Sequence, residues 1–142
     1  MANSLEISSS LAHDGDELVR FRITTLSKDF SGSVEAWGYA DNLGELAAKL
    51  QGFPQSDNSS VHFQFGSPQT GFCKLEFVCI DAVAHCGVWV TMEAAYPAVN
   101  QGFEKASIFF RVEPAAIDRF SSSLRAFNSG AIQNAALQGV AP

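Results

Sequence analysis

The sequence is poor in cysteine and in charge. Of its 142 residues, 17% are charged and three are cysteine. Cys73, Cys79 and Cys86 are an odd number without a C-x-x-C pair, which argues against a disulfide framework and against a zinc site of the usual spacing. We expect all three to be buried free thiols, because a free cysteine behaves as a small hydrophobic residue.

Long hydrophobic runs are also missing. The longest run that leans apolar, residues 82–92, is interrupted by His85, Cys86 and Gly87, whereas a membrane-spanning helix needs about 20 apolar residues in succession. The first residues lack the basic segment and apolar segment of a secretory signal. We therefore expect a soluble protein with no membrane partner, and the cytoplasm as its compartment.

Motifs that carry catalytic chemistry are missing as well. The chain has no G-x-x-x-x-G-K, G-x-G-x-x-G, H-E-x-x-H or G-x-S-x-G pattern. The acidic stretch 14–17 is no calcium loop, because Val19 and Thr25 stand where that loop needs glycine and glutamate. No catalytic residue, metal or cofactor is predicted, and an enzyme is the less favoured interpretation.

The charge that is present is acidic and uneven. Nine basic and fifteen acidic residues give a net charge of −6, and residues 1–45 hold eight of the acidic residues against Arg20, Arg22 and Lys28. An acidic surface repels nucleic acid and anionic lipid, so no nucleic-acid partner is expected. The charge fits two hypotheses, a basic protein partner and simple solubility.

The N-terminal residues predict a β-hairpin followed by a third strand. Ile7 and Ile23 lie in stretches where apolar and polar residues alternate, on either side of a polar turn at 13–16. Pairing Ile7 with Ile23 keeps the apolar side chains on one face, which requires a bulge or a three-residue loop at the turn. The third strand is expected at residues 33–39.

Two amphipathic helices are predicted. The first begins at a capping box, in which Asn42 caps the helix and Glu45 reaches back to it, and it ends before Pro54. The second begins at Pro114, whose missing N–H is tolerated in a first helical turn. Their apolar stripes are Leu43, Leu46, Ala47, Leu50 and Phe53 in the first, and Ile117, Phe120, Leu124 and Phe127 in the second.

Strands at 61–65, 72–80, 85–94 and 104–113 predict an antiparallel meander. The registers that bring apolar residues together pair Cys79 with Cys86, Leu75 with Val90, Phe65 with Cys73 and Val88 with Phe110.

These elements predict an α+β fold. We expect one antiparallel sheet of about six to seven strands with both helices packed on its apolar face, a two-layer sandwich. Residues 1–130 make a single domain, and residues 131–142, which contain no charge, make a loosely packed C-terminal tail.

The same registers leave large apolar side chains on the opposite face of the sheet. His62 faces Glu76 there, but an open face is not the concave site that general base catalysis needs. Either the first hairpin or the tail covers this face, or it is an association surface, most simply that of a homodimer. The residues assigned to this surface are Trp89, Phe109, Val78, Ile80, His62 and Glu76.

The order of elements, with LQGFP at 50–54, FGS at 65–67 and HCGV at 85–88, resembles that of small uncharacterised bacterial proteins, some of which are similar to immunity proteins of polymorphic toxin systems. The resemblance covers residues 30–127 as a pattern of hydrophobic residues and glycines. It implies a cytoplasmic, non-enzymatic binding protein. We therefore expect a protein-binding module, toxin-neutralising or regulatory, with a small-molecule-binding or enzymatic domain as the alternative.

Overall fold

The computed structural model describes residues 3–9, 18–39, 41–56, 58–68, 70–81, 83, 85–95, 103–129 and 133–141. The order of elements is β1 (Ser4–Ser9), β2 (Leu18–Leu26), β3 (Ser31–Tyr39), α1 (Asn42–Leu50), β4 (Ser60–Ser67), β5 (Gly71–Cys79), β6 (Cys86–Ala95), β7 (Phe103–Val112), α2 (Pro114–Asn128) and β8 (Asn134–Gln138).

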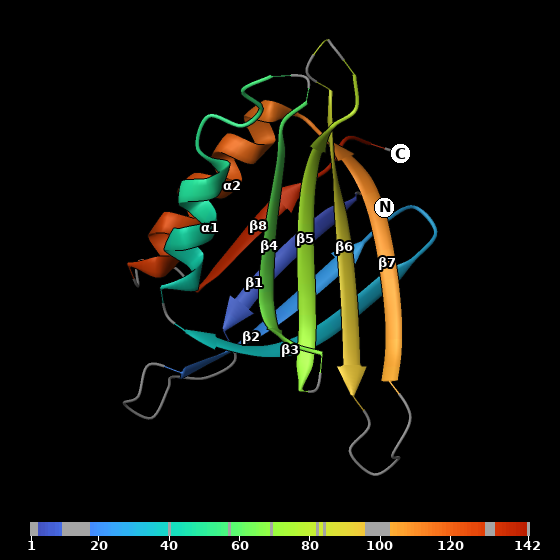
Figure 1. Cartoon of the computed structure of the whole chain (residues 1–142), viewed down its shortest axis with the longest axis vertical. Helices are drawn as coiled ribbons and strands as arrows, with labels where there is room; N and C mark the ends of the chain where they lie inside the picture. The colour runs from blue at the N-terminus through green and yellow to red at the C-terminus, as the bar shows by residue number, and fades with distance from the viewer. Residues whose placement is uncertain are drawn as a thin grey trace.

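The strands form two antiparallel sheets that face each other (Figure 1). Sheet A has the order β3-β2-β1-β8 and sheet B the order β4-β5-β6-β7. Their inner faces meet in one apolar core, in which the Phe21 and Phe65 rings pack edge to face at 5.3 Å between centroids. The α+β class and the antiparallel strands are as predicted, but the single sheet of six to seven strands is wrong.

The pairing within the sheets matches the sequence registers. Ile7 lies opposite Ile23. The predicted turn of the first hairpin, with its bulge, falls outside the described residues. In sheet B the structure has the four predicted pairs, Cys79 with Cys86, Leu75 with Val90, Phe65 with Cys73 and Val88 with Phe110. A side-chain period of two fixes register wherever one face is buried, so the apolar pattern was sufficient here.

The prediction that the helices alone cover the inner face of sheet B is wrong, because sheet A lies over this face and the helices meet only part of it. Helices α1 and α2 lie side by side and close one side of the sandwich, next to β4 and β8 (Figure 1). The Ser121 hydroxyl donates to the Ala47 carbonyl at 3.1 Å, and the Phe120 ring lies 6.5 Å from that of Phe77. Alternation shows which face is buried, but it does not show whether strands or helices cover that face.

The helix starts differ in how well they were predicted. Helix α2 begins at Pro114 as expected. Helix α1 has Asp41 as its N-cap, without a side-chain cap hydrogen bond, so the capping box at Asn42 is wrong in part. Asn42 does donate to the Glu45 carboxylate at 3.0 Å, but its own oxygen accepts from the Tyr39 N–H at 2.8 Å.

The predicted loose tail is wrong for residues 134–138. They form β8, which pairs with β1 and buries Ala135 and Leu137. Beyond the strand, the Gly139 N–H donates to the Asn3 carbonyl at 2.8 Å and the Val140 N–H donates to the Arg111 carbonyl at 2.7 Å. The end of the chain therefore joins sheet A to the last strand of sheet B.

Among the described residues, no helix has the length and apolar character needed to cross a bilayer.

Candidate functional site

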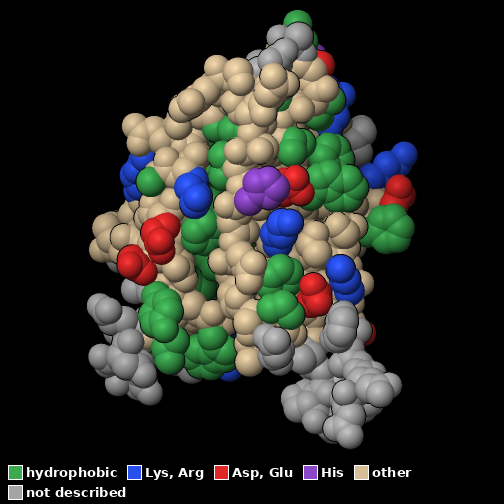
Figure 2. Space-filling view, viewed as in Figure 1, with side chains coloured by type: hydrophobic (Ala, Val, Ile, Leu, Met, Phe, Trp, Pro, Cys, Tyr) green, Lys and Arg blue, Asp and Glu red, His purple; other side chains and the backbone are tan. Residues whose placement is uncertain are grey.

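The predicted surface residues lie together on the outer face of sheet B, the face turned away from sheet A. Register places His62 opposite Glu76, Glu76 opposite Trp89, and Trp89 opposite Phe109. These four residues, one from each strand, form what we call the outer row. Figure 2 views the molecule from the side of sheet B and shows hydrophobic, charged and histidine side chains next to one another there.

The apolar centre of this face is a pair of aromatic rings. The Trp89 and Phe109 rings lie 4.9 Å apart between centroids, tilted by 48°. Trp89 remains 42% exposed and Ile80 45% exposed, while Val78 and Phe109 are partly buried. An aromatic pair at this distance packs favourably, and the Trp89 ring still leaves apolar area exposed.

A glycine beneath these rings was not singled out from the sequence. A Cβ added at Gly87 would collide with the Phe109 ring and would come within 3.4 Å of Ile80. The missing side chain lets Phe109 lie close against β6, beside Trp89. A glycine in a strand interior often marks such a close approach, and this signal was available in the sequence.

His62 and Glu76 form an exposed polar pair. The His62 Nε2 and Glu76 Oε2 atoms are 3.7 Å apart, and about half of the His62 side chain is exposed. This separation exceeds a hydrogen bond. The two residues form an exposed cross-strand polar pair beside the aromatic rings.

A groove of about 350 Å³ adjoins the aromatic pair. Its far wall is the turn between β2 and β3, in which the Ser27 N–H donates to the Phe30 carbonyl at 2.8 Å. Phe30 is 71% exposed at this turn. The groove is lined by Phe30, Trp89 and Phe109 together with Asn3, Ser27, Lys28, Asp29, Ser107 and Ile108. Phe30 could not be predicted from the sequence, because its nearness to β7 depends on how the two sheets cross.

The outer face of sheet B carries charges of both signs. Side chains alternate between the two faces along each strand, so the registers place three basic residues and two acidic residues on the same face as the outer row. With histidine neutral, the charge of this face is +1, although the whole chain carries −6. The charged residues on this face are Lys74, Lys105, Arg111, Glu76 and Glu93.

A second exposed tryptophan lies on the outer face of sheet A. Trp37 is 50% exposed, and the Arg20 guanidinium lies 5.9 Å from its ring centroid. Arg20 and Arg22 both lie 3.7 Å from a Glu35 carboxylate oxygen. The alternation of buried Val34 and Ala36 with exposed residues in β3 would have placed Trp37 outward. This face is separate from the outer row.

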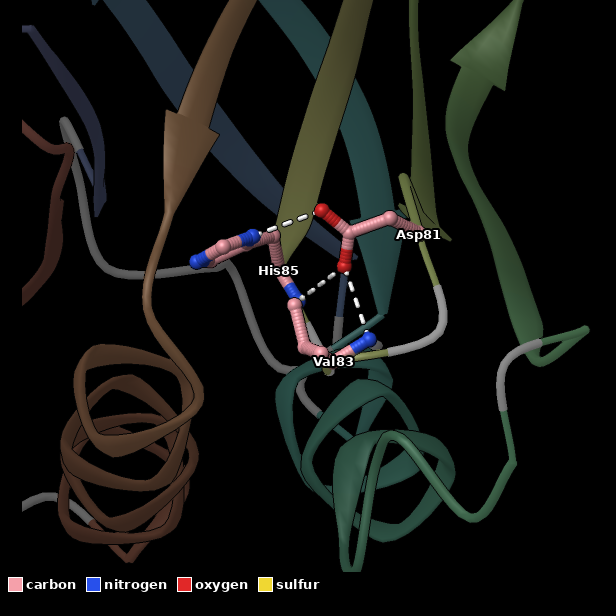
Figure 3. Close-up of polar contacts among 3 residues, drawn as sticks. All are labelled: Asp81, Val83 and His85. Atoms are coloured by element: carbon pink, nitrogen blue, oxygen red, sulfur yellow. Dashed lines mark hydrogen bonds and ion pairs between the residues drawn. The ribbon is translucent and has the colours of Figure 1, made fainter.

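The turn between β5 and β6 is held by Asp81 (Figure 3). Its Oδ1 atom accepts from the Val83 N–H at 2.9 Å and from the His85 N–H at 3.3 Å. Its Oδ2 atom lies 2.6 Å from His85 Nδ1. The hydrogen bond from the His85 ring, followed by those from the two N–H groups, lowers the pKa of Asp81. This ionised acceptor fixes the turn next to Ile80.

The thiols are as predicted in two of three cases. Cys73 and Cys86 are buried, whereas Cys79 is partly buried and its thiol donates to the Ser56 carbonyl at 3.2 Å. Burial raises the pKa of Cys73 to about 12. Burial, reinforced by Cys79, raises the pKa of Cys86 to about 11. Both thiols therefore hold their protons at neutral pH, and each becomes a more effective nucleophile only as the pH rises towards its pKa.

Within the described ranges, no cluster of histidine, cysteine, aspartate and glutamate is arranged to hold a metal ion. No protein-family model, no curated protein and no solved structure matches the chain.

Proposed function

We propose that the protein is a non-enzymatic protein-binding module and that its binding surface is the outer face of sheet B. The observation that carries this proposal is the Trp89–Phe109 ring pair on the outer face, in which Trp89, like the nearby Ile80, remains exposed. Apolar anchors surrounded by polar side chains are typical of interface centres.

The position of the N-terminal hairpin and of β8 supports this proposal. Strands β1 and β2 of the hairpin and β8 of the tail all belong to sheet A, on the other side of the core, so they do not cover the outer face. No element among the described residues lies over Trp89, and a monomer rarely leaves a contiguous apolar patch exposed without a use for it.

The partner that we propose for this face is a second copy of the chain. In a two-fold dimer the same patch meets itself, so it must be self-complementary. The mixed charges around the outer row meet this condition, because Lys74 and Lys105 on one copy are available to Glu76 and Glu93 on the other. The face is also the least acidic part of a chain that carries −6, which limits repulsion between copies.

A basic protein is the second proposed partner, in a toxin-neutralising or regulatory role. The net charge of −6 supports it. Two acidic residues, Asp41 and Glu45, lie at the start of α1, away from the outer row. Such a partner would bind there and leave the outer row free.

Small-molecule binding in the groove at Phe30 is the alternative function. The groove volume of about 350 Å³ lies within the range of ligand sites, and three aromatic side chains line it. Crystals soaked with aromatic fragments test this alternative: ordered density between Phe30 and Phe109 would favour it over protein binding.

Sedimentation equilibrium tests the dimer. Removing an anchor at an interface centre commonly costs about 2 kcal/mol or more, which is about a 30-fold rise in Kd. We expect a dimeric wild type, a weakened Trp89→Ala dimer, and no change for Trp37→Ala, which removes the other exposed tryptophan from the opposite side of the molecule.

Urea unfolding of the same variants completes the test. We expect Trp89→Ala to keep the monomer stable, because the ring is partly exposed. A wild type that stays monomeric at high concentration, or a Trp89→Ala variant that loses stability without changing association, would contradict the dimer.

A further inference from the structure

Cys79 and Cys86 lie directly opposite each other at the last pair of the β5–β6 ladder. The next pair towards the turn is hydrogen-bonded, since the Ile80 N–H donates to the His85 carbonyl at 2.7 Å. Pairs alternate in an antiparallel ladder, so Cys79 and Cys86 occupy a non-hydrogen-bonded pair. In agreement with this, the Cys79 N–H points the other way and donates to the Ser59 carbonyl at 3.3 Å.

This kind of pair brings two side chains as close as a β-sheet allows. Its Cα atoms are typically about 4.5 Å apart, at the short end of the range of about 4.4 to 6.8 Å that a disulfide bridges. Both side chains point to the inner face, and the Cys79 side chain is hydrogen-bonded to the Cys86 thiol. The position of the pair in the ladder is therefore one that a disulfide can bridge.

We infer that Cys79 and Cys86 form a thiol–disulfide exchange site, which closes into a cross-strand disulfide when a low-molecular-weight disulfide oxidises it. Both thiols are reduced in this structure. The inference does not rest on the proposed binding function.

Exposure sets the order of the exchange steps. Cys79 is the more accessible thiol, whereas Cys86 is buried. The Cys79 thiolate attacks the reagent, the S–S bond of the reagent breaks, and one thiol leaves with the proton from Cys79. The Cys86 thiolate then attacks Cys79 Sγ and releases the second thiol with the proton from Cys86. Two cysteine thiols and one disulfide thus give one protein disulfide and two small thiols.

The third cysteine does not take part. Cys73 lies opposite Met92, is fully buried, and is six residues from Cys79 along the same strand. Residues six apart in a strand are separated by about 20 Å, so Cys73 cannot reach the pair without unfolding. It provides a matched control.

Oxidised glutathione is the probe, added to the folded protein at mildly alkaline pH for several time points. The reaction is stopped with acid, and the remaining thiols are alkylated under denaturing conditions and counted by intact mass. We expect the number of alkylated thiols to fall from three to one, with a monomeric band on a non-reducing gel. Cys73→Ala should fall from two to none.

Variants identify each step. Cys86→Ala should stop at a glutathione adduct on Cys79, because the resolving thiol is missing, and Cys79→Ala should react slowly. The inference is overturned if the wild type keeps three alkylated thiols, if it stops at the adduct, or if the bond involves Cys73 or a second chain. None of these readouts depends on the association of the outer face.

Discussion

Burial dominates the chemistry of the cysteine side chains. Cys73 sits in the core between the sheets, opposite Met92 in register, and burial alone raises its pKa to about 12. A thiol in such surroundings holds its proton and is a poor nucleophile. The sequence predicted this environment, because alternation in β5 places Cys73 with Leu75 and Phe77 on the apolar face.

The raised pKa of Cys73 predicts a loss of stability at alkaline pH. A thiol whose pKa is higher in the folded state stabilises the protein fully below its ordinary value of 9.0, and this contribution is lost as pH rises towards 12. We expect the free energy of unfolding to fall by about 1.4 kcal/mol per pH unit for this thiol. Urea unfolding between these pH values measures it.

Cys73→Ala is the matched variant for this measurement. It should be less stable at neutral pH because it leaves a cavity, yet its stability should decline less steeply above the ordinary thiol pKa. Parallel pH curves for the wild type and Cys73→Ala would show that the thiol ionises equally easily in both states.

At the scale of elements, strand β8 is the clearest difference between sequence and structure. Its five residues, NAALQ, contain one large apolar side chain, and this pattern is too weak to stand out as a strand. Pairing with β1 buries Ala135 and Leu137 all the same, and bonds beyond the strand link it to Asn3 and Arg111. The strand therefore depends on its pairing with β1, because its own sequence pattern does not favour a strand.

Strand β8 should therefore contribute strongly to stability. Leu137 is fully buried, and truncating a buried leucine to alanine costs about 2 to 5 kcal/mol. We expect Leu137→Ala to lose stability in this range by urea unfolding, and Gln138→Ala, on the exposed face of the same strand, to change it by less than about 0.5 kcal/mol. Equal, small effects of both variants would indicate that β8 frays in solution.

The registers of sheet B and the outer row could be predicted from the sequence because they follow from one condition, that Phe77, Val88 and Phe110 share an apolar face. The cover of that face could not be predicted. The β1–β3 segment and the two helices all carry apolar stripes, and an apolar stripe does not show which other element packs against it. Phe30 was missed for the same reason, because it meets the outer face only through the crossing of the sheets (Figure 1).

At the scale of the whole molecule, the charge of the outer face of sheet B differs from that of the rest of the chain. The outer face of sheet B carries +1 while the chain carries −6, so the remainder carries −7. Association through the outer face of sheet B brings two acidic molecules together, whereas a basic partner is attracted by the acidic remainder of the chain. Long-range electrostatics is repulsive between two acidic copies and attractive between this chain and a basic protein.

The sign of the salt dependence should distinguish the two partners. Screening shortens from about 10 Å at 0.1 M to about 3 Å at 1 M salt. Two copies that each carry −6 repel each other beyond the contact, so we expect added salt to strengthen the dimer in sedimentation equilibrium. A basic protein should lose both association rate and affinity over the same range, because salt screens the attraction that steers it. A dimer that weakens steeply with salt would place opposite charges at the centre of the interface, and would contradict an interface centred on the Trp89 and Phe109 rings.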